Sequence, residues 1–353
     1  MATDNPFSAT SQLPAEWLPL LQQAGLNTEM DMAPAELPGA FVAVIADQCL
    51  VRIHGPDTRR FLQGQVTCDV QGLTPEQSLT GAACDPKGRA YGVFQLLALG
   101  DDEVLMQLPL TIADAFVAHL QKYLVFFKAE MTRADHWLQL GLHGSSAVTS
   151  LAGADAAMDN PGQVRPVAGG FIIASTPAAD GTPRHELWLD SQQCQALPPL
   201  TAPTLNSGAW RRSRIEAGLV LLTPDTSGAF LPQQLNLHAL GGVSFKKGCY
   251  TGQEVVARLH FLGKLKKSLF RLRISPATTP IARGEALESP HGKALGAVVD
   301  SIQDSDGFSH ALAVLSHEVI STGVRLTNNP QIPVTLEPLG YTVADQQPLP
   351  LKG

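Results

Sequence analysis

Two short apolar runs that end in His-Gly and precede a probable helix constrain the fold of this chain more than any other feature. They lie at 51–55 (VRIHG) and 140–144 (LGLHG). Their shared context predicts a duplicated half. Each half has the order strand, helix, strands, helix, strand of a ferredoxin-like α+β layer. A histidine at a strand end is more often a structural hydrogen-bonding residue than a catalytic one, so His54 and His143 are interpreted as structural.

Turn residues and apolar periodicity divide the first half into short elements. Asp57 is a favourable N-cap for a short helix that Gly64 ends. The turn sequence at 85–89 (DPKGR) joins two apolar runs and predicts a hairpin. Apolar residues recur at helical spacing from Thr111 to Tyr123. The predicted elements are strands at 41–45, 50–54, 79–84, 90–99 and 104–108 and a helix at 111–123.

The last third of the chain changes to short β-prone runs separated by glycine and proline, which predicts a small antiparallel barrel. These runs are 269–274, 294–300, 311–315, 324–327 and 334–336. The expected fold class is therefore α+β, with two ferredoxin-like domains and a C-terminal β-barrel. The expected layout is an extension at 1–37, α+β domains at 38–135 and 136–263, the barrel at 264–345 and a tail at 346–353.

The segment 245–258 (FKKGCYTGQEVVAR) concentrates the unusual chemistry of the chain. Positive charge from Lys246 and Lys247 would favour the thiolate of Cys249, which is the form that reacts. Gly248 and Gly252 permit a tight turn and the close approach of a ligand. The alternative is a buried, inert cysteine in a glycine-rich turn beside solvated lysines.

A second segment of interest, 210–218 (WRRSRIEAG), is predicted to form a helix that Gly218 ends. It carries Trp210 and Glu216. From the residues alone, Glu216 is an exposed helix acid that pairs with Arg212, four positions earlier.

The run Lys247-Gly248-Cys249-Tyr250-Thr251-Gly252-Gln253-Glu254, with Arg258 four residues later, resembles the signature of the YgfZ-type folate-binding family. These proteins are relatives of the aminomethyltransferase (T-protein) of glycine cleavage, and the similarity extends from about Phe41 to about Tyr341. The resemblance implies two α+β domains and a terminal barrel around a central site for tetrahydrofolate or a derivative. It also implies a role in maintaining iron-sulfur enzymes, including those that thiolate tRNA.

The resemblance also implies roles for individual residues. Cys249 would be the reactive thiol, with Lys247 and Arg258 beside it. Glu216 would hold the pterin, because two carboxylate oxygens can accept from adjacent N–H donors. Trp210 would flank the folate, and Gln48 stands where relatives carry a second tryptophan. The motif loop would be shaped by Gly248, Tyr250, Thr251, Gly252, Gln253 and Glu254, and the cavity rim by 61–69 and 85–89.

One departure from the T-protein concerns the reaction. Where that enzyme carries paired acids near the folate nitrogens, this chain has Gly92 and Val93. Without an acid to steer aminomethyl transfer, glycine cleavage is disfavoured. We therefore expect a folate-binding accessory protein. The alternatives are a folate-dependent one-carbon transferase and a folate-sensing scaffold that acts only through partner contact.

Charge is distributed unevenly along the chain. The net charge is −7, yet residues 246–273 hold eight Lys or Arg against the single acid Glu254. Such a strip is usually a solvated face, but it also suits an anionic ligand or RNA phosphates. The expected partners are folate and iron-sulfur client or assembly proteins, with direct RNA binding as a further possibility.

The five cysteines are scattered and contain no C-x-x-C pair. This argues against a disulfide framework and a stably bound metal, and it suits a reducing compartment. No apolar run approaches the length of a membrane span, and the first residues lack the pattern of a signal peptide. The expected location is the cytoplasm.

Overall fold

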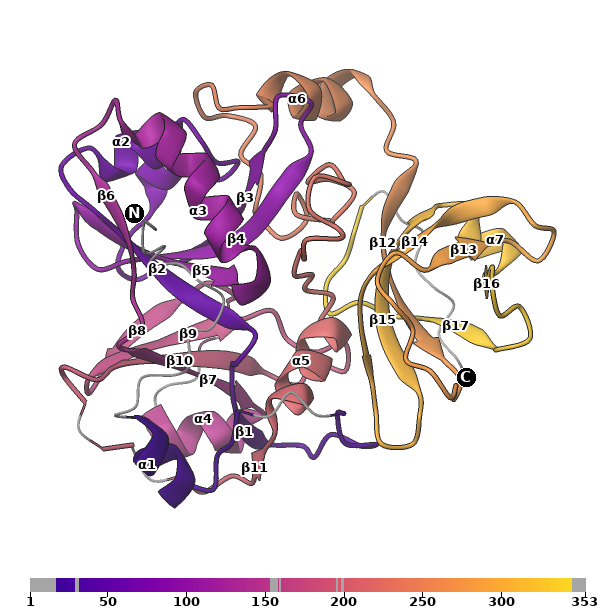
Figure 1. The fold of residues 1–353 in the computed structure, drawn as a ribbon, viewed down its shortest axis with the longest axis horizontal. Helices are drawn as coiled ribbons and strands as arrows, with labels where there is room; N and C mark the ends of the chain where they lie inside the picture. Colours follow the sequence, from indigo (N-terminus) through magenta and orange to yellow (C-terminus); the bar gives the residue numbers. More distant parts are fainter. Residues whose placement is uncertain are drawn as a thin grey trace, which may run out of the picture.

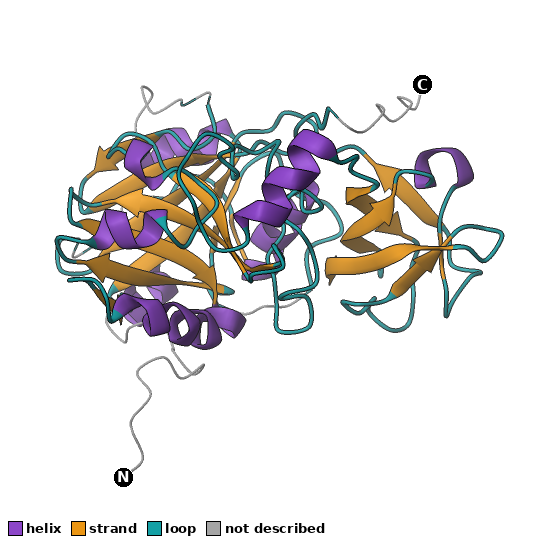
Figure 2. Cartoon of the chain, turned by 90° about the horizontal axis from the view of Figure 1, so that it is seen from above, coloured by secondary structure: helices purple, strands orange, loops and turns teal. Residues whose placement is uncertain are grey.

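The computed structural model describes residues 17–28, 32–152, 158, 160–194, 196–197 and 200–344. These residues form three β-sheets, of which two lie close together and the third stands to one side (Figures 1 and 2). The expected tail at 346–353 and the first sixteen residues of the expected extension lie outside the described residues. Within the extension, helix α1 (Trp17–Gln23) buries Trp17 and Leu21 against the second sheet.

The first sheet has the strand order β3-β4-β5-β2-β6. Helix α3 covers one face of this sheet together with α2 (Figure 1). The elements are β2 (Gln48–His54), α2 (Thr58–Gln63), the 3-10 turn η1 (Val70–Gly72), β3 (Leu79–Cys84), β4 (Ala90–Ala98), β5 (Glu103–Pro109), α3 (Leu110–Leu124) and β6 (Glu130–Arg133). The predicted hairpin is confirmed, because β3 and β4 pair antiparallel around the turn at 85–89.

The second sheet has the order β11-β1-β7-β10-β9-β8. Its elements are β1 (Phe41–Val44), β7 (Trp137–His143), α4 (Ser145–Ala152), β8 (Val164–Val167), β9 (Gly170–Ser175), β10 (Arg184–Asp190) and β11 (Thr204–Leu205), followed by α5 (Ser207–Glu216). Strands β8-β9-β10-β7-β1 repeat the arrangement of β3-β4-β5-β2-β6. This agrees with the duplication that the repeated His-Gly runs predicted.

Each half keeps the expected ferredoxin-like pairing and adds one strand. In a ferredoxin-like layer the sheet is antiparallel, and the first strand lies beside the third. Here β2 pairs antiparallel with β5, and β7 pairs antiparallel with β10. The difference is that three strands follow the first helix of each half instead of two, and the additional strand, β3 or β8, lies at the edge of its sheet.

Strand β1 (Phe41–Val44) does not join the sheet formed by the strands that follow it. It falls within 38–135, but it pairs with β7 of the second sheet, with Phe41 opposite His143. It occupies the position that β6 takes beside β2 in the first sheet. A local sequence pattern identifies β1 as a strand, whereas its partner is set by long-range packing.

The glycines after the two histidines are required by their backbone. Gly55 and Gly144 have φ angles of 127° and 81°. A Cβ on Gly55 would overlap the carbonyl of Lys128, and one on Gly144 would overlap the carbonyl of Gly39. Each His-Gly therefore ends its strand where another chain segment crosses closely.

The third sheet is a curled antiparallel half-barrel with the order β16-β13-β14-β15-β12-β17. It encloses its own apolar core, which includes Leu272, Val298 and Leu315. The elements are β12 (Lys267–Ile274), β13 (Ala286–Glu288), β14 (Ala294–Gln303), β15 (Ser309–Ser316), α7 (Val319–Thr322), β16 (Arg325–Leu326) and β17 (Val334–Glu337). Within 200–344 the edge strands β16 and β17 do not pair with each other, so the expected barrel is not closed.

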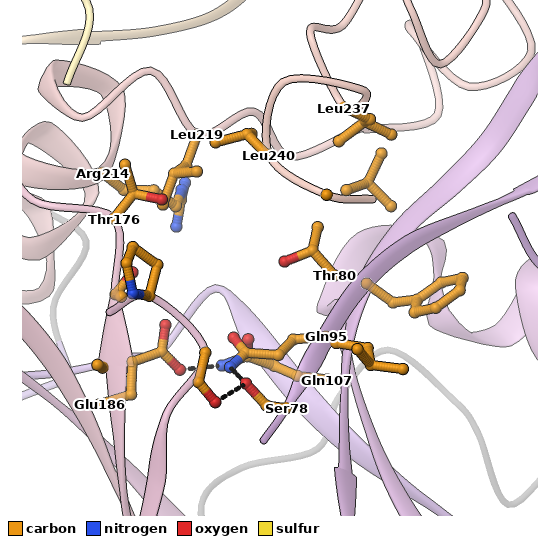
Figure 3. Close-up of a pocket in the computed structure, with 18 of the residues that line it drawn as sticks. Ser78, Thr80, Gln95, Gln107, Thr176, Glu186, Arg214, Leu219, Leu237 and Leu240 are labelled. Atoms are coloured by element: carbon orange, nitrogen blue, oxygen red, sulfur yellow. Dashed lines mark hydrogen bonds between the residues drawn. The ribbon is translucent and has the colours of Figure 1, made fainter. Parts of the chain in front are cut away.

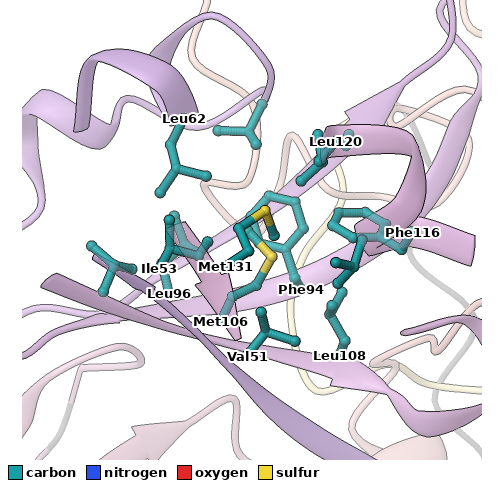
Figure 4. Close-up of a cluster of buried hydrophobic side chains, with 14 of the residues drawn as sticks. Val51, Ile53, Leu62, Phe94, Leu96, Met106, Leu108, Phe116, Leu120 and Met131 are labelled. Atoms are coloured by element: carbon teal, nitrogen blue, oxygen red, sulfur yellow. The ribbon is translucent and has the colours of Figure 1, made fainter. Parts of the chain in front are cut away.

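The first sheet is buried on both faces because neighbouring residues of its strands enter different cores. Met106 of β5 points toward α2 and α3, where it packs with Leu62 and Phe116 (Figure 4). The preceding residue, Leu105, packs with Trp188 of the second sheet. This arrangement explains why the strands appear in sequence as nearly continuous apolar runs. It also brings the two α+β sheets together around the site described next.

Candidate functional site

A cavity of about 310 Å³ lies between the first and second sheets. Its remaining wall is the C-terminal end of α5 and parts of the segment 219–241 (Figure 3). The volume is at the lower end of the range of roughly 300–1,000 Å³ for small-molecule sites. Gln48, Gln107, Glu186 and Arg214 supply polar groups to a lining that also contains Val93 and Leu240.

Glu186 is the only acid among the described residues that line this cavity. It lies on β10 and is 6% exposed. Its Oε2 accepts hydrogen bonds from Gln107 Nε2 at 2.7 Å and from Trp188 Nε1 at 3.0 Å. Within the described ranges, Oε1 accepts no hydrogen bond. Burial raises the pKa of Glu186, so a ligand that donates to this carboxyl group would stabilise its charged form.

Arg214 supplies positive charge to the cavity from α5 (Figure 3). Its Nη1 lies 2.9 Å from Asp47 Oδ2, and its Nη2 lies 3.5 Å from Asp300 Oδ2. None of its three side-chain nitrogens makes a well-oriented hydrogen bond to a described residue. The cavity therefore presents a buried acceptor, the Glu186 carboxylate, and a donor, the Arg214 guanidinium, whose N–H groups are available to a ligand. Such a pair suits a flat heterocycle that carries both N–H groups and acceptors.

The two residues predicted to contact folate do not line this cavity. Trp210 is 1% exposed. Its ring packs directly on the backbone of Gly141, where a Cβ would overlap it. The guanidinium carbon of Arg184 lies 4.2 Å from the ring centroid. Of the residues expected at the folate site, Gln48 does line the cavity.

Glu216 faces the third sheet instead. Its Oε1 lies 2.8 Å from Arg212 Nε, 3.4 Å from His310 Nδ1 and 3.9 Å from Arg271 Nη2. The alternative interpretation, a pair with Arg212, is therefore present, although Glu216 is largely buried. The physical reason is helix geometry, because two residues along α5 correspond to a rotation of about 200° from the cavity-facing Arg214.

Sequence reasoning missed Glu186 as a site residue. The available signal was an acid directly before the apolar residues 187–189 (LWL) of a predicted strand. A charged side chain in a buried strand requires partners, and this requirement often marks a functional position.

An ionic cluster behind the cavity joins α5 to the third sheet. Asp300 of β14 is fully buried, and its Oδ1 lies 2.7 Å from Arg211 Nη2 and 3.0 Å from Arg283 Nη2. Burial by itself would raise the pKa of Asp300, but the charges of Arg211, Arg214 and Arg283 together lower it. Since Arg214 also lines the cavity, this cluster connects the third sheet to the site.

The motif loop is held by Lys247, which is buried. Its Nζ donates to the carbonyl oxygens of Gln63, Val66 and Cys68 at 2.8, 2.6 and 2.9 Å. Burial lowers the pKa of Lys247 to about 8, and only the protonated amine has a donor for all three oxygens. Lys247 therefore anchors the loop to the segment 61–69.

Replacing Lys247 by methionine is expected to lower the free energy of unfolding by about 2 kcal/mol, because three carbonyl groups lose a charged donor. Urea denaturation measures the change. The neighbouring variant Lys246→Met is the control, since Lys246 is exposed and its loss should change stability by less than about 0.5 kcal/mol. Equal effects of the two variants would contradict the anchoring role.

The glycines of the motif meet the hairpin turn. Gly252 has a φ angle of 84° and precedes α6 (Gln253–Leu262). A Cβ on Gly252 would overlap the carbonyl of Asp85 and lie 2.9 Å from the Cα of Gly88. The resemblance-derived segments 61–69, 85–89 and 247–254 thus form one contiguous structure beside the first sheet.

Cys249 is the exposed cysteine of the five. Burial raises the pKa of Cys49 to about 11 and the pKa values of Cys68 and Cys84 to about 12. These shifts disfavour the thiolate at the three buried positions. The expectation that Cys249 is the most reactive thiol stays a prediction, although the ammonium of Lys247 is engaged with carbonyl groups.

The other motif residues differ in their surroundings. Tyr250 is buried, and its ring centroid lies 5.0 Å from Lys247 Nζ. Arg258 is exposed on α6 and makes no ion pair or hydrogen bond to a described residue. In the described ranges, no cluster of three or more His, Cys, Asp or Glu side chains is arranged to hold a metal ion. None of the helices described above combines the length and apolarity needed to cross a membrane.

Comparison with known proteins places this geometry in context. No family model matches the chain. The chain is 33% identical over 325 residues to the tRNA-modifying protein YgfZ of Yersinia enterocolitica, covering 90% of this chain and 96% of that protein. It is 31% identical over 313 residues to the protein of the same name from Colwellia psychrerythraea, covering 88% of this chain and 95% of the relative.

Among solved structures, the glycine cleavage system aminomethyltransferase T from Bartonella henselae shares the fold, with a TM-score of 0.68 and 18% identity. The match covers 95% of this chain and 99% of that one. The shared arrangement therefore includes the two α+β sheets and the third sheet. By its similarity to these relatives over most of its length, the chain belongs to the family of the tRNA-modifying protein YgfZ.

Proposed function

We propose that this protein binds tetrahydrofolate or a derivative in the cavity between the two α+β sheets and supports tRNA modification. The observation that carries the proposal is that Glu186 of β10 and Arg214 of α5 both line one cavity. Oε1 of Glu186 is available to accept from the N–H groups of an amino-pyrimidinone, and Arg214 can donate to an acceptor of the same ligand. When bound, the folate supplies a carrier of one-carbon units.

The other polar residues of the cavity orient these two. Gln107 holds Oε2 of Glu186, and its Nε2 also donates to Gln139 Oε1 at 2.7 Å. One of these bonds holds the carboxylate, and the other holds the Gln107 amide in place. Asp47 and Asp300 hold Arg214 by charge, with their oxygens 2.9 and 3.5 Å from its guanidinium nitrogens. Preorganised groups of this kind reduce the entropy lost on ligand binding.

Cys249 would act on a client while folate occupies the cavity. A single cysteine cannot hold an iron-sulfur cluster, which generally needs four protein ligands. We propose that the exposed thiol contacts a cluster, a sulfur atom or a one-carbon adduct on an iron-sulfur enzyme that modifies tRNA. A reducing cytoplasmic setting would keep this thiol free.

A one-carbon transferase is the second candidate, favoured by the shared fold of the aminomethyltransferase. The wall of the cavity argues against it. Val93 lines the cavity, and a Cβ on Gly92 would overlap the ring of Phe116, so neither position offers a carboxylate. An assay for folate-dependent glycine cleavage with the partner proteins would distinguish the two functions.

Glu186→Gln is expected to weaken tetrahydrofolate binding about 10- to 150-fold, because it removes a charge-assisted pair worth roughly 1.5–3 kcal/mol. Isothermal titration calorimetry measures the affinity. Glu216→Gln is the matched control, since this acid faces the third sheet. Unchanged affinity in Glu186→Gln would refute the assignment, and a selective loss in Glu216→Gln would restore the prediction from sequence.

A further inference from the structure

Helix α6 is poorly covered by the rest of the protein. Val256 is its one buried residue. At its C-terminal end Phe261 is 65% exposed and Leu262 is 84% exposed. Figure 1 shows α6 at the edge of the molecule, above the tip of the β3–β4 hairpin. Large apolar side chains left in solvent at one place commonly mark a site of interaction.

Unpaired cations precede and follow this helix end along the chain. Lys246, Arg258, Lys264, Lys266 and Lys267 are all exposed. In the part of the chain that the structure describes, none of their side chains forms an ion pair. Glu254 is the single acid between 245 and 267 of a chain whose net charge is −7. We call these five cations, with Phe261 and Leu262, the basic aromatic surface.

A ring stack joins Phe245, at the start of the motif segment, to the last turn of α6. Phe245 stacks on His260 with centroids 3.6 Å apart and an interplanar angle of 9°. Phe261 meets His260 edge-on at 4.8 Å. Lys246 follows Phe245 directly, so it lies at the same end of α6 as Phe261. Aromatic rings flanked by cations are therefore presented from the segment that also carries Cys249.

We propose that the basic aromatic surface is an RNA-docking surface. Phosphates neutralise unpaired lysines and arginines, and this supplies most of the affinity for nucleic acid. Unstacked bases of RNA loops pack on exposed aromatic rings such as Phe261. The inference rests on the proposed function and deepens it, because it brings RNA itself to the Cys249 loop.

An RNA fits these observations better than a membrane surface does. A helix that lies in a bilayer interface presents a broad apolar face along its length. On α6, Glu254 and Arg258 interrupt the exposed side, and its two most exposed apolar residues are adjacent at one end. The exposed cations thus suit a polyanion, and the exposed ring of Phe261 suits a ligand whose bases can stack on it.

Fluorescence anisotropy with a labelled tRNA transcript tests the proposal. In the triple variant Lys264→Glu, Lys266→Glu, Lys267→Glu, affinity should fall at least tenfold. The slope of log K against log salt should become shallower by about two to three, since each lost phosphate contact contributes about 0.7 to 0.9. Phe261→Ala should weaken binding about five- to 150-fold with little change in slope.

The matched control is the triple variant Lys122→Glu, Lys128→Glu, Lys293→Glu, which makes the same charge change at exposed positions elsewhere. It should bind tRNA as the wild type does. Equal loss in both triple variants would overturn the proposal in favour of nonspecific charge. Binding to phosphatidylglycerol vesicles that depends on Phe261, without binding to tRNA, would overturn it in favour of a membrane surface.

Calorimetry with tetrahydrofolate on the same variants separates this inference from the proposed function. Lys264, Lys266 and Lys267 do not line the folate cavity, so folate affinity should be unchanged. Intact folate binding without tRNA binding contradicts the docking surface alone. Intact tRNA binding without folate binding contradicts the folate site alone.

Discussion

Asp300→Ala is expected to lower the free energy of unfolding by about 3–5 kcal/mol, the largest stability effect of any single substitution considered. Removing one member of a buried ionic cluster leaves the remaining charges uncompensated. Here Arg211, Arg283 and Arg214 would lose a shared carboxylate that is fully buried. Urea denaturation followed by circular dichroism measures the loss.

The control for this variant is Glu288→Ala. Glu288 also pairs with an arginine of the third sheet, Arg325, at 2.8 Å, but that arginine side chain is 35% exposed. Partly solvated pairs contribute only about 0–1 kcal/mol. If Asp300→Ala cost no more than Glu288→Ala, the cluster would not be what joins α5 to the third sheet.

Cys249→Ala is expected to abolish the cellular function while leaving the fold intact. A strain lacking this protein should lose activity in tRNA-thiolating iron-sulfur enzymes, most severely under oxidative stress. The wild type should restore that activity and Cys249→Ala should not. Because Cys249 is exposed, its loss should change neither stability nor folate affinity. Quantifying thiolated nucleosides in tRNA measures the effect.

Cys194→Ala provides the comparison, since Cys194 is partly exposed and lies outside the motif loop. It should restore tRNA thiolation as the wild type does. Full restoration by Cys249→Ala would leave the protein as a folate-binding scaffold that acts only through partner contact. That outcome would contradict the thiol mechanism without affecting the folate site.

Much of the local structure could be predicted because its signals lie within a few residues. Helix α5 ends at Glu216, and the predicted Gly218 terminates it with a φ angle of 80°. The N–H of Leu219 donates to the carbonyl of Arg214, and the N–H of Gly218 donates to that of Ile215. The hairpin turn formed because Asp85 Oδ1 accepts from the backbone N–H groups of Lys87 and Arg89. Such interactions depend on residue type and spacing alone.

The cap predicted at Asp57 shows where a local signal competes with a distant one. Asp57 does occupy the N-cap position of α2, but its side chain makes no capping bond. Its Oδ2 instead accepts from the backbone N–H of Lys128 at 2.9 Å. The Asp57 carboxylate therefore bonds to Lys128, 71 positions away, instead of to the backbone N–H groups of the first turn of α2.

Most strands and helices, the duplicated half and the motif segment could be predicted from sequence, because periodicity, turn chemistry and a long motif are properties of neighbouring residues. The pairing of β1 with the second sheet and the position of Glu186, not Glu216, at the central cavity became known only from the tertiary structure. Both acids lie in segments that a sequence can recognise as strand or helix. Which side of each element meets the cavity depends on packing between residues far apart in the chain, and local patterns do not encode it.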